Sequence, residues 1–210
     1  MDSGTVVAQR VTDFDAAGFP AAEAWAGAQA VAFEWDWRGV HADPERLTEV
    51  RVMWTAETLF LRFALRYRTI TVYADAREDG WRDELWDRDV AEAFLQPDSS
   101  DPRKYLEFEV APNGHWIDLL ISHGTKAELG SKLKRRVVMD EAKKTWTAEL
   151  AIPMKSLTAN FSELDVWRVN FFRVEGEKES RFYSAWRPTK TEAPQFHVPE
   201  AFGKLIFDRD

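Results

Sequence analysis

The residues best suited to chemistry are three glutamates and one tryptophan near the middle of the chain. Glu92 lies inside the apolar run "VAEAFL", while Glu107 and Glu109 alternate with apolar residues in "YLEFEV". Trp86 stands among acidic residues shortly before Glu92. If residues 86–92 are extended, Trp86 and Glu92 share one face of a strand, because successive side chains alternate. Such a face could stack a sugar ring on the indole and accept its hydroxyls on the carboxylate.

The same residues are compatible with two other roles. Glu92 together with Glu107 or Glu109 could act as the carboxylate pair of a glycoside hydrolase, whose two carboxyl groups stand about 5 Å apart in a retaining enzyme. Trp86 and Glu92 could instead be a core tryptophan and a buried, paired glutamate, and the pattern alone leaves these alternatives open. The sequence contains no G-x-S-x-G elbow, phosphate-binding loop or dinucleotide fingerprint.

Metal ligands are sparse in this sequence. The four histidines are His41, His115, His123 and His197. They form no H-x-x-x-H or H-E-x-x-H pattern, and the chain has no cysteine, so we expect them to be surface or core polar residues. The segments "DRDV" and "PDSSDP" offer clustered oxygen ligands of the kind that calcium prefers, although EF-hand spacing is absent. We expect no cofactor and leave a structural calcium ion open.

The elements that must position these residues are strands. Apolar residues recur at every second position in "TLFLRFALR", which places Leu59, Leu61 and Phe63 on one face. Further strands are expected in "TEVRVMW", "KYLEFEV", "HWIDLLI", "RRVVM", "TWTAELAI", "VWRVNFFRV", "RFYSAW" and "GKLIF". Asn113-Gly114 predicts a hairpin, because this dipeptide suits a tight turn between strands.

Helical pattern is confined to two short stretches, residues 21–28 and residues 153–157. Many short strands with regular turn signals and little helix are typical of an all-β protein, and we predict an antiparallel β-sandwich, jelly-roll-like in its connections. The length of 210 residues and an apolar content of 45% suit one domain with a sizeable core. We expect residues 13–210 to form that single domain and residues 1–12 to form a flexible N-terminal tail.

Charge and hydropathy exclude several classes of partner. The net charge of −8 argues against nucleic acid and against anionic membrane surfaces, which both require a basic face. No run approaches the roughly 20 apolar residues of a membrane span. The first residues, "MDSGTVVAQRVTDFD", show no basic region followed by an apolar one, so no signal peptide is predicted in them.

Five motifs in order resemble the family 9 carbohydrate-binding modules, which are known as appendages of bacterial xylanases. The motifs are "AEAW", "EVRVMWTAETLFLRFAL", "LWDRDVAEAFL", "TWTAELAIPMKSL" and "FHVPEAFGKLIF". The resemblance extends from about Phe14 to Phe207 and implies a β-sandwich that binds sugars without catalysis. It also implies a secreted or periplasmic location once a signal has been removed, a role in polysaccharide degradation, and association with other modules of a carbohydrate-active enzyme system.

In that family two aromatic side chains clamp the sugar ring. By position, the resemblance implies that Trp86 and Phe196 form the clamp and that Glu92 accepts hydroxyl hydrogen bonds. Glu107 and Glu109 are expected to line the same pocket, and Trp81 and Trp186 are further candidates close to the two clamp positions. The candidate ligand-binding residues are therefore Trp86, Phe196, Glu92, Glu109, Glu107, Trp81 and Trp186. The expected partner is a mono- or oligosaccharide.

The sequence departs from the xylanase-borne members at two site positions. Glu109 stands where those members have an arginine, and Ala193 lies near the place of an asparagine that precedes the second clamp residue. An Arg-to-Glu exchange reverses the charge and removes a fork of five hydrogen-bond donors. The alternatives of a cation-bridged ligand, an amine-bearing ligand and a ligand-free structural or interaction domain therefore stay open beside sugar binding, as does hydrolysis.

Overall fold

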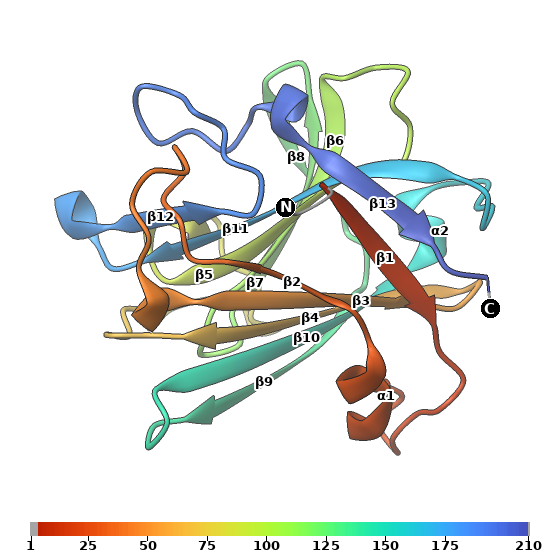
Figure 1. The fold of residues 1–210 in the computed structure, drawn as a ribbon, viewed down its shortest axis with the longest axis horizontal. Coiled ribbons are helices and arrows are strands. Elements are labelled where there is room, and N and C mark those ends of the chain that lie inside the picture. The colour runs from red at the N-terminus through yellow and green to blue at the C-terminus, as the bar shows by residue number, and fades with distance from the viewer. Residues whose placement is uncertain (1–3, 210) are drawn as a thin grey trace.

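The computed structural model describes residues 4–209, and they are almost entirely β-structure (Figure 1). The strands are β1 Thr5–Arg10, β2 Ala30–Phe33, β3 Thr48–Trp54, β4 Thr58–Arg66, β5 Val90–Gln96, β6 Lys104–Val110, β7 Trp116–Ser122, β8 Thr125–Glu128, β9 Lys134–Asp140, β10 Thr145–Pro153, β11 Val166–Glu175, β12 Phe182–Ala185 and β13 Gly203–Phe207. The α-helices are α1 Ala22–Gly27 and α2 Met154–Leu157. Four 3₁₀ turns, η1 to η4, cover Pro44–Arg46, Leu85–Asp87, Lys178–Ser180 and Pro199–Ala201.

The strands form one continuous hydrogen-bonded sheet that curls upon itself (Figure 1). Its order is β8-β7-β6-β5-β11-β13-β1-β3-β4-β10-β9, with β12 paired to β11 and β2 paired to β3. Neighbouring strands run antiparallel except around β1, which runs parallel to both β13 and β3. The expected all-β class is therefore observed, while the sheet is continuous and contains two parallel pairings.

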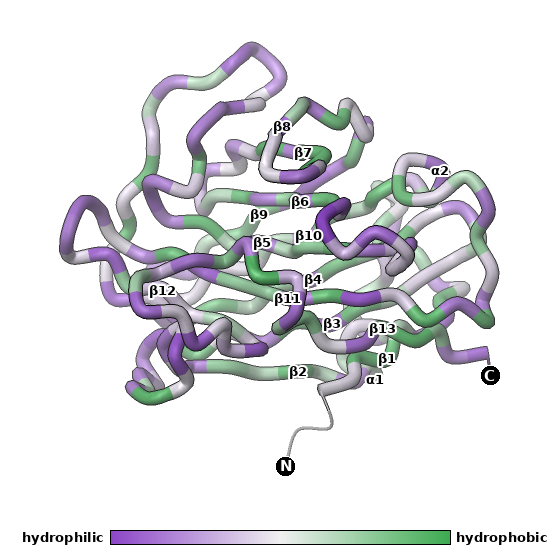
Figure 2. Tube along the Cα trace, turned by 90° about the horizontal axis from the view of Figure 1, so that it is seen from above, coloured by the Kyte–Doolittle hydropathy of each residue, from purple (hydrophilic) through white to green (hydrophobic). Residues whose placement is uncertain are grey.

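The curled sheet encloses its own hydrophobic core, as the period-two pattern predicted. Leu59, Leu61 and Phe63 of β4 are buried on one face. The ring of Phe63 meets the ring of Phe171 on β11 edge to face, with 5.9 Å between centroids, so the two halves of the sheet pack against each other. In Figure 2 hydrophobic segments follow the strands, and the loops at their ends are mostly hydrophilic.

The N-terminal expectation is corrected by the structure. Residues 1–3 of the expected flexible tail lie outside the described residues, but Thr5–Arg10 forms strand β1 between β13 and β3. Val6 and Ala8 are buried to 1% and 0% exposure, because they face the core while their neighbours in "TVVAQR" alternate outward. The segment is short and only weakly apolar, so its sequence alone did not indicate a strand. Pairing with β13 and β3 on either side stabilises it.

The hairpin between β6 and β7 matters most for the site, because it sets the register of the glutamate-bearing strand. Gly114 adopts a φ of +84° in the Asn113-Gly114 turn, as expected for the tight connection. The register places Val110 opposite Trp116 and Glu107 opposite Leu119. Among residues 4–209, no helix is long and apolar enough to cross a membrane.

Candidate functional site

One pocket collects most of the residues that the sequence singled out. It has a volume of about 290 Å³ and lies over β5, β6 and the end of β11. Trp86 of turn η2 and Phe196 of the segment before β13 contribute aromatic side chains, and Glu92 and Glu107 contribute carboxylates. Two segments that are distant in sequence therefore meet at this pocket, because β11 pairs with β5 and β13 pairs with β11.

Trp86 is half-buried on the wall of the pocket. The ammonium of Lys126 on β8 lies 3.7 Å from the centroid of a Trp86 ring, which is a cation–π contact. The adjacent Asp87 is held by an ion pair of 2.6 Å to Arg181, which also lines the pocket. These contacts hold the indole at the pocket rather than in the core.

Phe196 lies more deeply than Trp86, at 8% exposure. Its ring stacks on Phe172 of β11 with 4.2 Å between centroids and 14° between planes, and the ring of Tyr183 meets it edge-on at 5.9 Å. One face of Phe196 is therefore committed to the core, while the residue still lines the pocket. Trp86 and Phe196, the two residues that the family resemblance assigned to a clamp, line one pocket, and Tyr183 lines it as well.

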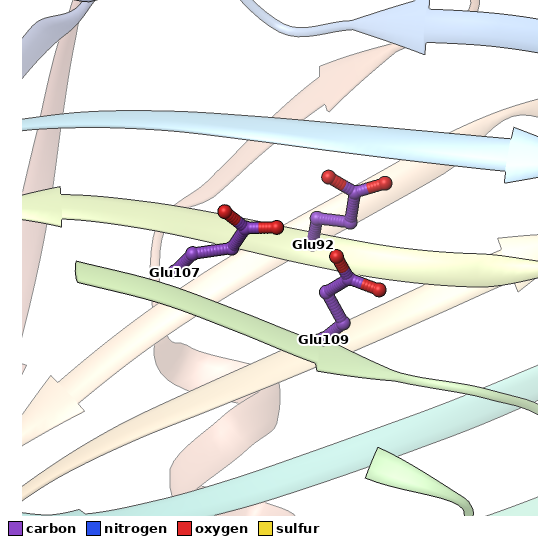
Figure 3. Close-up of side chains that lie close together, drawn as sticks. All are labelled: Glu92, Glu107 and Glu109. Atoms are coloured by element: carbon purple, nitrogen blue, oxygen red, sulfur yellow. The ribbon is translucent and has the colours of Figure 1, made fainter. Parts of the chain in front are cut away.

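The three glutamates converge at the closed end of the pocket. Glu92 on β5 stands directly opposite Glu109 on β6, and Glu107 lies two residues along β6 on the same face. Figure 3 shows the three carboxyl groups on one side of these strands, turned toward one another. One oxygen from each lies within 4.8 Å of the others. Glu107 and Glu109 alternate with apolar residues along β6, and both faces of the strand are buried.

All three carboxylates are removed from solvent, with exposures of 2% for Glu92, 1% for Glu107 and 0% for Glu109. When the three groups are ionised, no protein hydrogen bond reaches Oε1 of Glu92, Oε2 of Glu107 or either oxygen of Glu109, whereas a proton on Glu109 can be shared with Glu107. Burial raises the pKa of Glu92 well above its usual value, the Glu107 charge adds to this, and Lys126 opposes it. Burial also raises the pKa of Glu109, with the charges of Glu92 and Glu107 acting in the same direction.

His197 borders the same end of the pocket. Its Nδ1 lies 2.8 Å from the Tyr105 hydroxyl and 4.0 Å from Oε2 of Glu107. Burial lowers the pKa of His197, although the Glu107 charge opposes the shift. The site thus has aromatic walls and carboxyl groups. The carboxyl groups accept hydrogen bonds and, when protonated, also donate them. Lys126 and Arg181 are the basic side chains that line it. Among residues 4–209, Glu92, Glu107 and Glu109 also form the set of acidic side chains that could surround a metal ion.

Trp81 and Trp186 do not line this pocket. Trp81 is 8% exposed, forms a bridge with Trp116, and carries the Arg77 guanidinium 3.7 Å from a ring centroid. Trp186 is 4% exposed and packs against Phe171, and its six-membered ring fills the space where a Cβ on Gly203 would lie 2.6 Å away. Both tryptophans are core residues, and their assignment to the site is wrong. Proximity in sequence to a clamp position does not set the direction of a side chain.

Sequence reasoning missed Lys126, Arg181, Tyr183 and His197, which also line the pocket. Lys126 belongs to "TKAE" on β8, whose four residues are all exposed overall and read as an ordinary polar hairpin. No local pattern marks it, because its role depends on β8 lying at the end of the sheet beside β7. Tyr183 and His197 likewise reach the pocket only through the tertiary arrangement.

One residue of the acidic stretch around Trp86, Asp89, stabilises the fold through backbone hydrogen bonds. Asp89 is buried and accepts hydrogen bonds from the backbone N–H groups of Thr71 and Gly176, at 3.1 and 2.5 Å. Burial raises the pKa of Asp89 to about 6 despite these bonds. In the other acidic loop, Asp98 and Asp101 accept from the backbone N–H groups of Ser100 and Arg103. Calcium in these two loops stays a prediction.

The curled β-sheet with an aromatic and carboxylate pocket defines a class of ligand-binding domain, and the family comparison makes this specific. Residues 35–207 match the model of carbohydrate-binding family 9. The chain therefore belongs to carbohydrate-binding family 9, as the sequence motifs indicated.

Proteins from other organisms are similar to this chain in sequence or in fold. An extracellular protein of Arthroderma benhamiae is 25% identical over 178 residues, which cover 76% of this chain and 78% of the relative. A protein of Bacteroides uniformis, for which carbohydrate binding has been proposed, has a similar structure. The TM-score is 0.75 at 17% identity, and the match covers 97% of this chain and 99% of the other. A family 9 module of Caldicellulosiruptor kristjanssonii, solved with cellotriose, gives a TM-score of 0.63 at 11% identity and coverage of 97% and 93%.

Proposed function

We propose that this protein is a non-catalytic carbohydrate-binding domain whose pocket holds one sugar ring. The observation that carries the proposal is the meeting of Trp86, Phe196, Glu92 and Glu107 around one pocket of about 290 Å³. Apolar C–H faces of a pyranose pack on aromatic rings, and carboxylates are strong acceptors for hydroxyl groups. Membership of carbohydrate-binding family 9 supports the same function.

The expected pose places the ring against Trp86, with its hydroxyls toward the glutamates at the closed end. Lys126 occupies space over Trp86 at 3.7 Å, so a ring that stacks there must displace its ammonium or share the indole with it. Phe196 and Tyr183, whose rings meet edge-on at 5.9 Å, line the same pocket and offer further apolar contact to the ring. We expect affinities from micromolar to millimolar, because a single stacked ring buries little area.

Binding is favoured over hydrolysis by the placement of the carboxylates. Glycosidases position two carboxyl groups on either side of the bond that they cleave. Here Glu92, Glu107 and Glu109 lie on one face of two neighbouring strands, at the closed end of the pocket. Chromogenic glycosides test the alternative directly: turnover by the protein that is lost in Glu92→Gln would favour hydrolysis.

Calorimetric titration with glucose and cellotriose tests the proposed function, since a structurally similar family 9 module was solved with these sugars. Trp86→Ala should weaken binding roughly tenfold or more, because the packing of a sugar ring on one aromatic side chain contributes on the order of 1 kcal/mol or more. Trp35→Ala is a matched control: Trp35 is 45% exposed and does not line the pocket. Equal binding by both variants would remove Trp86 from the site, and no binding of any mono- or oligosaccharide would favour a structural domain.

We also propose an extracytoplasmic location and association with other modules of a carbohydrate-active system. The name of the Arthroderma relative as an extracellular protein supports the first part. Fractionation of the native source organism, with detection by antibody, would test it. Recovery only with the cytosolic fraction would contradict the proposed location without affecting sugar binding.

A further inference from the structure

The closed end of the pocket has an unusual chemical composition for a protein interior. Glu92, Glu107 and Glu109 bring three carboxylates together with exposures of 2% or less. Two of these residues also line the open pocket, so a small ion can reach the cluster from solvent. No ion pair within 4.0 Å joins any arginine or lysine of residues 4–209 to these three glutamates.

The orphaned oxygens show that the protein alone does not satisfy this cluster. When the cluster is ionised, neither oxygen of the fully buried Glu109 has a hydrogen-bond partner, and Glu92 and Glu107 each have one such oxygen. A buried polar atom without a partner costs on the order of 1–3 kcal/mol, and a buried charge costs more. Such groups persist in folded proteins when a ligand, an ion or water completes them.

We propose that Glu92, Glu107 and Glu109 bind one divalent cation of the calcium type, with its remaining coordination positions open toward the pocket. Calcium takes oxygen ligands at about 2.3–2.6 Å, so two oxygens on opposite sides of one ion lie up to about 5 Å apart. The three carboxylate oxygens lie within 4.8 Å of one another, which suits that sphere. Mg²⁺, with ligands at about 2.0–2.1 Å, would need a tighter arrangement.

The charge of the site supports a divalent ion. The three glutamates carry three negative charges when ionised, and Lys126 lines the same pocket as Glu92 and Glu107. One divalent cation together with Lys126 therefore neutralises the cluster. An ammonium ligand is less well supported, because the Lys126 ammonium is tethered nearby and yet lies over Trp86 instead of pairing with the carboxylates.

An ion in this position would also take part in sugar binding, and this part of the inference rests on the proposed function. Three protein oxygens leave several of the 6–8 calcium positions for water or ligand. Because Glu92 and Glu107 line the pocket, those positions face the space where the sugar ring is proposed. Two neighbouring hydroxyls of a sugar could replace two waters on the ion, while Trp86 packs against the ring. Sugar affinity should then depend on the cation.

The experiment begins without sugar. The full chain is stripped with EDTA, transferred to chelator-free buffer, and titrated by calorimetry with CaCl₂ and with MnCl₂; Tb³⁺ luminescence sensitised by tryptophan gives a second readout. We expect one ion per chain. Glu109→Gln and Glu92→Gln should each weaken the ion affinity roughly tenfold or more, because one charged ligand is lost. Glu163→Gln should bind the ion like the parent, since Glu163 is exposed and does not line the pocket.

Each outcome separates this inference from the proposed function. Ion binding that is equal in the parent, in Glu109→Gln and in Glu92→Gln would place the ion elsewhere and overturn the proposal. Failure of Ca²⁺ and Mn²⁺ to bind the parent would also overturn it, and sugar binding that stays intact in EDTA, or glucosamine bound through its ammonium, would then leave the proposed function standing. Ion binding that is lost in Glu109→Gln and Glu92→Gln but kept in Glu163→Gln would support the site even if no sugar binds. Far-ultraviolet circular dichroism and thermal unfolding in EDTA show that each variant is folded.

Discussion

Glu92 and Glu109 lie directly opposite each other on the antiparallel strands β5 and β6, and both are buried. Like charges at directly opposed positions destabilise a sheet, and burial adds to that cost. When the cluster is ionised, neither oxygen of Glu109 has a hydrogen-bond partner in the protein. The pair is therefore a place where this sequence gives up stability, and such places are commonly functional sites.

Glu109→Gln should stabilise the protein when divalent cations are absent. The substitution keeps the size of the side chain and removes one of three clustered charges, so we expect a gain of about 1–2 kcal/mol in the free energy of unfolding. Urea denaturation in EDTA at slightly alkaline pH, where more of the cluster is ionised, measures it. Glu163→Gln on the exposed surface should change stability by less than about 0.5 kcal/mol. A clear loss of stability in Glu109→Gln would show that the carboxylate has a partner.

Trp86→Ala and Trp81→Ala should separate binding from folding. Trp86 is half-buried at the pocket, so its removal should reduce sugar affinity and lower the unfolding free energy only modestly. Trp81 is 8% exposed, and its loss should cost about 3–5 kcal/mol through the cavity that it leaves. Paired thermal unfolding and glucose titration measure both effects. If Trp81→Ala remained as stable as the parent but lost binding, the exclusion of Trp81 from the site would be wrong.

Asp89 should make stability depend on pH. Its pKa of about 6 in the folded protein exceeds the ordinary value of 3.8, since burial outweighs its two backbone hydrogen bonds and the nearby Arg173, and Glu175 adds to the rise. The folded state thus holds this proton more tightly than the unfolded chain. The resulting contribution, on the order of 3 kcal/mol at most, is present below pH 3.8 and is lost as pH rises to about 6.

Urea unfolding between pH 3.5 and about 7 measures this dependence, and Asp89→Asn should remove the part that Asp89 contributes. Asn keeps a carbonyl oxygen that can accept one of the N–H groups of Thr71 and Gly176. Glu92→Gln serves as a comparison, because the raised pKa of Glu92 acts in the same direction. An unchanged pH profile in Asp89→Asn would assign the dependence to the glutamate cluster instead.

Deletion of residues 1–10 should severely destabilise the domain. β1 is hydrogen-bonded on both sides, to β13 and to β3, and Val6 and Ala8 lie in the core. Its removal opens the sheet in the middle and exposes two strand edges. If the protein without residues 1–10 still unfolded cooperatively at the parental temperature, β13 and β3 would not need β1.

The local pattern of the sequence was sufficient for the all-β class, for most of the strands and for the hairpin at Asn113-Gly114. These features follow from alternation and turn chemistry within a few residues. The strand β1 escaped prediction because "TVVAQR" is stabilised by partners on two other strands. The exclusion of Trp81 and Trp186 from the pocket likewise depends on packing that no local window contains.

For the site, the sequence by itself determined which residue types were available, and the family resemblance predicted that Trp86, Phe196 and Glu92 lie in one pocket, which all three do line. Only the tertiary structure decided that Glu92 and Glu109 stand opposite each other, that Glu107 joins them, and that Lys126 covers Trp86. The physical reason is that register between strands and burial are set by the whole curled sheet. A carboxylate on an alternating strand becomes either a solvated acid or a buried, unpartnered ligand only when that sheet has closed.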